Sequence, residues 1–294
     1  MITVVGATGH TGSAVASRLL AAGKKVRAVA RSRDRLETLA RRGAEIAAGD
    51  VYDETFFATV LRDAEAAYAL VPPDYAQPDL RRLYNRFGDA LVSALRASGL
   101  GRLVFLSSLG AELPAGTGPI AGLHDVEERL APLGLDVLVL RPGYFYENFY
   151  ASLPLIRHQG VVGGAIAPDV RFPMTAARDI GAVAAEALAA GNFRGFTVRE
   201  VLGPRDYSMR EATRIIGEKI GKSDLAYVQF PDADVKAWLV QVGFSAGAAD
   251  AMVEMSRAIT EGRVRSQQGR RPENTAPTLL ETFAEELAQA YRAG

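Results

Sequence analysis

The stretch Ile2-Thr3-Val4-Val5-Gly6-Ala7-Thr8-Gly9-His10-Thr11-Gly12 joins an apolar run to a helical pattern through a glycine-rich turn. A strand, a glycine turn and a helix in this order are typical of a βαβ unit that binds the pyrophosphate of a dinucleotide at the helix N-terminus. Gly6 permits the tight turn, Gly9 lets the backbone approach the phosphates, and Gly12 lets the helix pack closely on the strand. We therefore predict a cofactor loop made of Gly6, Ala7, Thr8, Gly9, His10, Thr11 and Gly12.

The composition favours a protein that acts on small molecules. Lys plus Arg and Asp plus Glu both number 34, so net charge gives no reason to expect nucleic acid or an anionic membrane as a partner. The chain has no cysteine and only three histidines, so we expect no thiolate catalysis and no metal site. No basic leader precedes the first apolar run and no apolar stretch could span a bilayer, which favours a soluble cytoplasmic protein.

The first half of the chain alternates between strand-like and helix-like segments. This pattern predicts an α/β fold, a Rossmann-type doubly wound parallel sheet with helices on both faces. The six expected strands are Ile2 to Val5, Val26 to Ala30, Glu45 to Ala47, Ala66 to Val71, Leu103 to Leu106 and Val137 to Leu140.

A smaller α+β lobe is expected towards the C-terminus. We predict a Rossmann domain over residues 1–148 and a smaller lobe for substrate or partner over 149–294, with segments near 174–202 returning to the Rossmann domain. Gly160 to Pro173 is rich in Gly and Pro and is expected to be a loop beside the cleft. The remaining elements are predicted as helices at Ala177 to Ala190, Met209 to Gly221, Ala246 to Gly262 and Thr278 to Tyr291, and strands at Thr197 to Leu202 and Ala226 to Phe230.

The residues after the second strand indicate which dinucleotide is bound. An NAD-preferring protein usually places an acidic residue here, whereas this chain has Arg31 and Ser32. A guanidinium can pair bidentately with a 2′-phosphate and a hydroxyl adds a donor, so NADP(H) is predicted to be preferred over NAD(H). The alternative is a solvated run of charges, which is the expected role of Arg33 and Arg35.

Three further segments end strands at the edge where ligands bind in open parallel sheets. Asp50 could accept a hydrogen bond from the adenine amine or be a plain turn residue. The run Val71-Pro72-Pro73 lacks two backbone donors and suits a wall beside the nicotinamide ribose, although a rigid strand exit would look the same. Ser107 closes the fifth strand, where it could contact the cofactor or cap a helix.

Together these segments resemble the NmrA-like family of atypical short-chain dehydrogenases/reductases. The resemblance spans nearly the whole chain and also implies cofactor contacts at Val51, Pro142 and Gly143. Such proteins include NADPH-dependent quinone, azo-dye, enone and imine reductases as well as cofactor-sensing regulators. The motifs that carry it are Gly6 to Gly12, Val26 to Arg31, Gly49 to Val51, Leu140 to Phe149, Asp179-Ile180, and Gly203-Pro204 with Glu211.

The chain departs from the family at the expected proton donor. No tyrosine is followed four residues later by lysine, so the Tyr-x-x-x-Lys pair of typical short-chain dehydrogenases is missing. Related atypical reductases carry a lysine or histidine where this chain has Leu123. Its neighbour His124 could donate a proton near neutral pH, but one step around a helix turns a side chain by about 100°, so a surface histidine is the competing interpretation.

Aromatic residues after the sixth strand are expected to form the acceptor pocket. Tyr144 could present its phenol to a carbonyl or quinone oxygen, or simply line the pocket together with Phe145. Tyr146 has the same two possible roles. Asn148 could orient the substrate or cap the following helix.

Two functions are consistent with this pattern. The first is an NADPH-dependent oxidoreductase that transfers hydride to a quinone-like, azo, enone or imine acceptor, because a quinone can take its proton from solvent. The alternative is a non-catalytic NADP(H)-sensing regulator that forms a homodimer or binds a protein partner through the smaller lobe, with the helices at Ala246 to Gly262 and Thr278 to Tyr291 as the expected surface. A sugar-nucleotide epimerase is disfavoured because Tyr-x-x-x-Lys is missing.

Overall fold

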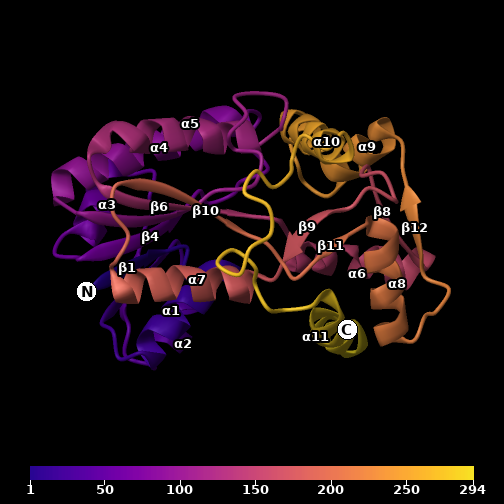
Figure 1. The fold of residues 1–294 in the computed structure, drawn as a ribbon, viewed down its shortest axis with the longest axis horizontal. Helices are drawn as coiled ribbons and strands as arrows, with labels where there is room; N and C mark the ends of the chain where they lie inside the picture. Colours follow the sequence, from indigo (N-terminus) through magenta and orange to yellow (C-terminus); the bar gives the residue numbers. More distant parts are fainter.

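The computed structural model describes residues 1–294 and has a seven-stranded parallel sheet at its centre (Figure 1). The strand order is β10-β6-β5-β4-β1-β2-β3, so the predicted Rossmann-type sheet is confirmed, and the strand predicted at Thr197 to Leu202 joins the six expected in the first half. That strand, β10, pairs with β6 from Phe196 to Val201, opposite Val137 to Pro142. The strands are β1 (Ile2–Val5), β2 (Val26–Ala30), β3 (Glu45–Ala48), β4 (Ala66–Leu70), β5 (Arg102–Leu106), β6 (Asp136–Pro142) and β10 (Phe196–Val201).

Helices cover both faces of this sheet, as its nearly continuous apolar strands require. One face carries α3 (Glu54–Leu61), α4 (Leu80–Ser98) and α5 (Ile120–Leu130), and the other carries α1 (His10–Ala21), α2 (Glu37–Ala40) and α7 (Ala177–Ala190) (Figure 1). Short 3₁₀ turns lie at Asp34–Leu36 and Ala131–Leu133. Helix α7 packs so closely on α1 that a Cβ at Gly181 would lie 2.5 Å from the Cβ of Ala14, so the glycine makes this contact possible.

The smaller lobe lies beyond the carboxyl ends of the strands (Figure 1). It has a three-stranded sheet in the order β11-β9-β7, a two-stranded sheet β12-β8, and a core of its own. Its strands are β7 (Tyr144–Phe145), β8 (Val161–Gly164), β9 (Phe172–Thr175), β11 (Asp206–Tyr207) and β12 (Ala226–Gln229). Its helices are a 3₁₀ helix at Tyr146–Ser152, α6 (Leu153–Gln159), α8 (Met209–Ile220), α9 (Asp232–Gln241), α10 (Ala246–Thr260) and α11 (Leu280–Ala293).

The expectation of a loop from Gly160 to Pro173 was wrong at both ends of that segment. Val161–Gly164 pairs in parallel with Ala226–Gln229, and β9 begins at Phe172. A Cβ at Gly163 would lie 2.1 Å from the Phe230 ring, so this glycine is needed for close packing. Glycines that accommodate such contacts look like loop residues when only the sequence is read.

The segment between α10 and α11 ties the two parts of the molecule together. Glu200 of β10 is only 2% exposed, and its carboxylate accepts hydrogen bonds from the Gln267 amide at 2.7 Å and from the Ser266 hydroxyl. Asp179 of α7 likewise accepts from the amide and hydroxyl of Thr278 at 3.0 and 2.9 Å. No helix in the chain is both long and apolar enough to cross a lipid bilayer.

Candidate active site

The glycine loop after β1 has the geometry of an anion-binding turn. Gly6 adopts φ +69°, and a Cβ at Gly12 would lie 2.2 Å from the Gly6 carbonyl oxygen, so both positions require glycine. A Cβ at Gly9 would meet only the Gly6 oxygen, at 3.4 Å, which leaves space beside the loop. Helix α1 starts at His10, and no side chain caps its first amides. Free amide donors beside open space fit the pyrophosphate of a dinucleotide.

Side-chain and backbone contacts hold the glycine loop against the parallel sheet and the smaller lobe. Thr11 is buried, and its hydroxyl accepts a hydrogen bond from the core Tyr68 hydroxyl at 2.9 Å. The Ala7 amide donates to the Val29 carbonyl at 3.1 Å, which fixes the turn against β2. His10 is exposed and stacks on the ring of Tyr150 in the smaller lobe, with centroids 6.2 Å apart. The start of the loop is therefore fixed against β2, and His10 lies at the boundary with the smaller lobe.

The other predicted cofactor residues follow successive strands of the same sheet. Because all seven strands are parallel, their carboxyl ends share one edge, and the order reverses between β1 and β4. Dinucleotides bind at such a switch point. The structure brings to this edge Arg31 and Ser32 after β2, Asp50 and Val51 after β3, Val71, Pro72 and Pro73 after β4, Ser107 after β5, and Pro142 and Gly143 at the end of β6.

The two residues proposed to read the adenosine half differ in how they are engaged. The Arg31 side chain is exposed and makes no hydrogen bond or ion pair within the protein, so its guanidinium is available to an anion. The Asp50 carboxylate accepts a hydrogen bond from the Tyr52 amide at 3.0 Å, which is the geometry of an Asx turn. Asp50 thus has the turn role, and its second carboxylate oxygen is free for a further contact.

A cavity of about 280 Å³ lies between the strand ends and the smaller lobe. Of the 19 residues that line it, 12 are hydrophobic, and none carries a formal charge. The predicted pocket residues Tyr144, Phe145 and Asn148 all belong to its wall. The other lining residues are Tyr75, Tyr84, Ser107, Ser108, Leu109, Pro119, Ile120, Leu123, Pro142, Gly143, Phe172, Pro173, Met252, Met255, Ile259 and Val264.

Tyr144, in the wall of this cavity, is held by aromatic packing. Its ring makes edge contacts with Phe149 and Phe172, at centroid distances of 6.1 and 5.8 Å. Burial raises the pKa of Tyr144 to about 12, and the neighbouring Asn148 side chain offsets part of that rise. The phenol therefore stays protonated throughout the physiological pH range and can act as a hydrogen-bond donor.

The structure does not bring His124 into the cavity. Its Nδ1 lies 2.9 Å from the Ala111 carbonyl oxygen, and the residue is not part of the cavity wall. Leu123, one step earlier on α5, does line the cavity. Where related reductases carry a lysine or histidine, this chain therefore presents the apolar side chain of Leu123 to the cavity. The His124 imidazole contacts a backbone carbonyl instead.

Ser107 is anchored by a buried charge network behind the cavity. Its hydroxyl donates to the Glu127 carboxylate, which is only 4% exposed. Arg141 of β6 binds the same carboxylate through Nε at 3.1 Å and Nη2 at 2.6 Å, and reaches Glu112 at 3.2 Å. Ser107 therefore has a fixed orientation, and its oxygen lone pairs remain for a ligand in the cavity.

Several cavity residues carry no signal in the sequence. Tyr84 lies on an amphipathic helix, where an aromatic residue reads as core, and Tyr75 lies in the segment after β4. Met252 and Met255 come from α10, more than 140 residues beyond the fifth strand. Only the folded arrangement brings these side chains together, so spacing along the chain could not have found them.

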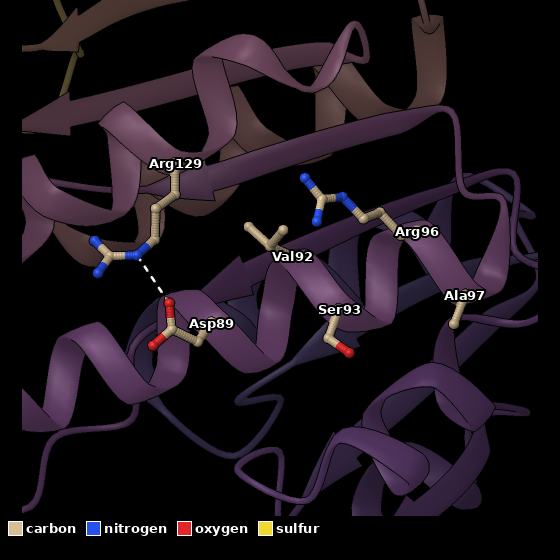
Figure 2. A pocket seen from close by; sticks show the side chains of 6 residues that line it. All are labelled: Asp89, Val92, Ser93, Arg96, Ala97 and Arg129. Carbon is tan, nitrogen blue, oxygen red and sulfur yellow. Dashed lines mark hydrogen bonds and ion pairs between the residues drawn. The ribbon is translucent and has the colours of Figure 1, made fainter.

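A second hollow lies on the outer side of α4, beside α5 (Figure 2). It is an open depression lined by Asp89, Val92, Ser93, Arg96, Ala97 and Arg129, with Asp89 and Arg129 paired at 2.9 Å. None of the predicted site residues borders it. The cavity at the strand ends is therefore the candidate active site.

Known proteins resemble this chain over most of its length. The NmrA-like family model matches residues 1–289. The chain is 27% identical to quinone oxidoreductase 2 of Escherichia coli over 270 residues, which is 89% of each protein. It is 33% identical over 223 residues to the (4-alkanoyl-5-oxo-2,5-dihydrofuran-3-yl)methyl phosphate reductase of Streptomyces griseus, covering 76% of this chain and 74% of that protein.

The fold also matches a solved structure over its whole length. An NADPH-dependent quinone oxidoreductase of Escherichia coli, crystallised with NADPH, superposes with a TM-score of 0.82 at 23% identity, covering 98% of this chain and 99% of that one. At this identity the likeness concerns the fold alone. The family match nevertheless extends over both the glycine loop and the cavity wall, and the chain belongs to the NmrA-like family.

Proposed function

We propose that the protein is an NADPH-dependent oxidoreductase that transfers hydride to an uncharged conjugated acceptor, with a quinone as the representative substrate. The observation that carries this proposal is the cavity at the strand ends, where Ser107 and Gly143 from the cofactor edge share a wall with Tyr144 and Phe145. Bound NADPH would supply the hydride. The protein itself would position the acceptor and exclude water.

The chemistry of the cavity supports this acceptor class. Its wall is mostly apolar and aromatic, which suits a flat ring system. A quinone spreads the charge gained on reduction over its ring, so it tolerates a site without a Tyr-x-x-x-Lys pair. The Streptomyces relative is named for a phosphate ester, but this wall offers no cation to pair with a phosphate. The name of the Escherichia coli relative supports a quinone instead.

A pair of naphthoquinones tests the proposed acceptor class. We expect kcat/KM for menadione to exceed that for a sulfonated naphthoquinone by at least roughly 30-fold, because an unpaired charge loses about 2 kcal/mol or more when it enters an apolar site. Leu123→Lys places an ammonium group in the cavity wall that can pair with the sulfonate. This variant should therefore lower the ratio of kcat/KM for menadione to kcat/KM for the sulfonated naphthoquinone. Equal kcat/KM values for both acceptors in the wild-type protein would contradict the proposal.

Arg31 is proposed to select NADPH through its free guanidinium. Arg31→Ala should weaken NADPH binding by about 1 to 3 kcal/mol, the loss expected for a charge-assisted hydrogen bond to the 2′-phosphate. Binding of NADH, which lacks that phosphate, should be unchanged. Arg35→Ala, a nearby exposed arginine, serves as the control and should leave both affinities unchanged. Calorimetric titration with each nucleotide measures this, and an equal loss for both would contradict the assignment.

The regulator alternative would require a surface for a partner rather than a cavity for an acceptor. The exposed large apolar residues lie mainly on or just after α9, where Trp238 is 47% and Val242 is 51% exposed, rather than on the two helices expected from the sequence. The cleft is open, with about 280 Å³ of space beside the cofactor edge. An open cleft favours the oxidoreductase over the regulator.

A further inference from the structure

Two tyrosines of the cavity wall present phenols that the protein itself does not use. Tyr75 and Tyr84 both line the cavity, and neither hydroxyl makes a hydrogen bond within the protein. A hydroxyl that has no partner in the protein and borders a cavity can donate its hydrogen bond to a bound molecule. Two unpaired phenols beside an open cavity therefore point to a ligand that accepts hydrogen bonds.

Tyr84 is fixed in place by close packing between two helices. It lies on α4, and a Cβ at Gly122 of α5 would come within 2.7 Å of its Cβ, so only glycine allows the helices to approach this closely. The residue is 8% exposed. Its hydroxyl is not among the fully buried polar atoms that lack a partner, so it reaches accessible space, and the cavity borders this side chain.

Tyr75 is held from the opposite side by the smaller lobe. Its ring stacks on Phe244 with centroids 4.6 Å apart and planes 11° from parallel. The Ser245 amide donates to the Tyr75 carbonyl at 2.9 Å, which fixes the backbone as well. Tyr75 and Tyr84 thus reach the same cavity from two sides, one from the segment held by the smaller lobe and one from α4.

The two serine hydroxyls of the cavity wall already donate hydrogen bonds within the protein. The Ser107 hydroxyl donates to Glu127, and the Ser108 hydroxyl donates to the Leu109 carbonyl at 3.0 Å. The Tyr144 phenol lies beside the Asn148 side chain. The hydroxyls of Tyr75 and Tyr84, in contrast, have no hydrogen-bond partner within the protein.

We propose that Tyr75 and Tyr84 together hold the carbonyl oxygen of the acceptor and stabilise the negative charge that develops on it. This inference rests on the proposed function and deepens it, because it assigns the oxygen-binding groups and orients the acceptor in the cavity. Two preorganised donors aimed at a developing oxyanion act as an oxyanion hole.

The protonation state of the pair suits a role in hydrogen bonding. Burial raises the pKa of both phenols, so both remain protonated at neutral pH. A hydride brings two electrons and one proton to the quinone, and the charge gathers on the oxygen that the phenols hold. The second proton, which completes the hydroquinone, comes from water, so the phenols are unchanged at the end of the reaction.

Phenylalanine substitutions test the pair. Tyr75→Phe and Tyr84→Phe remove only the hydroxyl, which has no partner in the protein, so the melting temperature and the Kd for NADPH should not change. We expect each to lower kcat/KM for menadione roughly tenfold and to weaken menadione binding to the NADP⁺-loaded protein by a smaller factor, because the charge is greatest in the transition state. Tyr291→Phe, outside the cavity, is the matched control.

The outcomes separate this inference from the proposed function. If the wild-type protein binds menadione without reducing it, and both variants bind it more weakly, the phenol pair stands while the proposed reaction fails. If both variants keep wild-type rates and menadione affinity within twofold, the phenol pair is overturned while the reaction stands. A wild-type protein that neither binds nor reduces menadione would overturn the inference.

Discussion

Gly9→Val is expected to abolish binding of both NADPH and NADH while leaving the fold intact. A Cβ at Gly9 would meet only the Gly6 carbonyl oxygen, at 3.4 Å, which is an ordinary van der Waals contact. The valine side chain would instead fill the space beside the uncapped amides of α1, where the pyrophosphate must approach the backbone. Nucleotide affinity should therefore fall by at least roughly 100-fold, equivalent to about 2.7 kcal/mol or more.

The appropriate control carries the same substitution at a glycine outside the site. Gly101 is exposed, and a Cβ added there would have no neighbour within 4 Å, so Gly101→Val should keep wild-type affinity. Calorimetric titration and thermal unfolding of both variants separate loss of binding from loss of fold. A folded Gly9→Val protein that still binds NADPH would mean that the glycine loop is not the cofactor site.

Glu127→Ala is expected to destabilise the protein by about 3 kcal/mol, the usual loss when one partner of a buried ion pair is removed. Burial is the largest single influence on the pKa of Arg141 and would lower it, but the hydrogen bonds to Glu127 and the negative charges of Glu127, Glu112 and Glu200 together raise it. Without Glu127, this buried cation keeps only Glu112, at 3.2 Å, as its close ion-pair partner. The Ser107 hydroxyl loses its acceptor at the same time.

Glu128 provides the matched control, because it is the next residue on the same helix and is exposed with no ion pair. Glu128→Ala should change the free energy of unfolding by less than about 0.5 kcal/mol. Urea unfolding of the two variants measures the difference. If they were equally stable, the network behind the cavity would contribute nothing to the fold, and another cause would have to fix the orientation of Ser107.

The order of strands and helices in the first half could be predicted from the sequence because local signals and tertiary structure agree there. Each of the six predicted strands is a short apolar run bounded by turn residues, and each is present in the sheet to within one or two residues. The seventh strand, β10, could be predicted at Thr197 to Leu202, but its partner in the sheet could not be predicted, because only three of its six residues are apolar. Its place beside β6 depends on the long excursion of the chain through the smaller lobe.

Some residues of the candidate site could be predicted from the sequence and others could not. Residues that follow strands, such as Arg31 and Ser107, could be predicted because the carboxyl ends of parallel strands always share one edge. The cavity wall from α4 and α10 could not, since Tyr84 and Met252 follow no local rule and meet only after both lobes have packed. His124 shows that a sequence does not fix which of two neighbouring helical residues faces a cavity. Leu123 lines the cavity, whereas His124, one residue later, contacts the Ala111 carbonyl.

The most direct test of the account is whether the purified protein couples NADPH oxidation to reduction of menadione. We predict loss of NADPH that depends on menadione, increases in proportion to enzyme concentration, yields one hydroquinone for each NADPH and is absent from the Gly9→Val variant. Tight NADPH binding with no menadione-dependent oxidation would contradict the proposed reaction, although the cofactor site would stand.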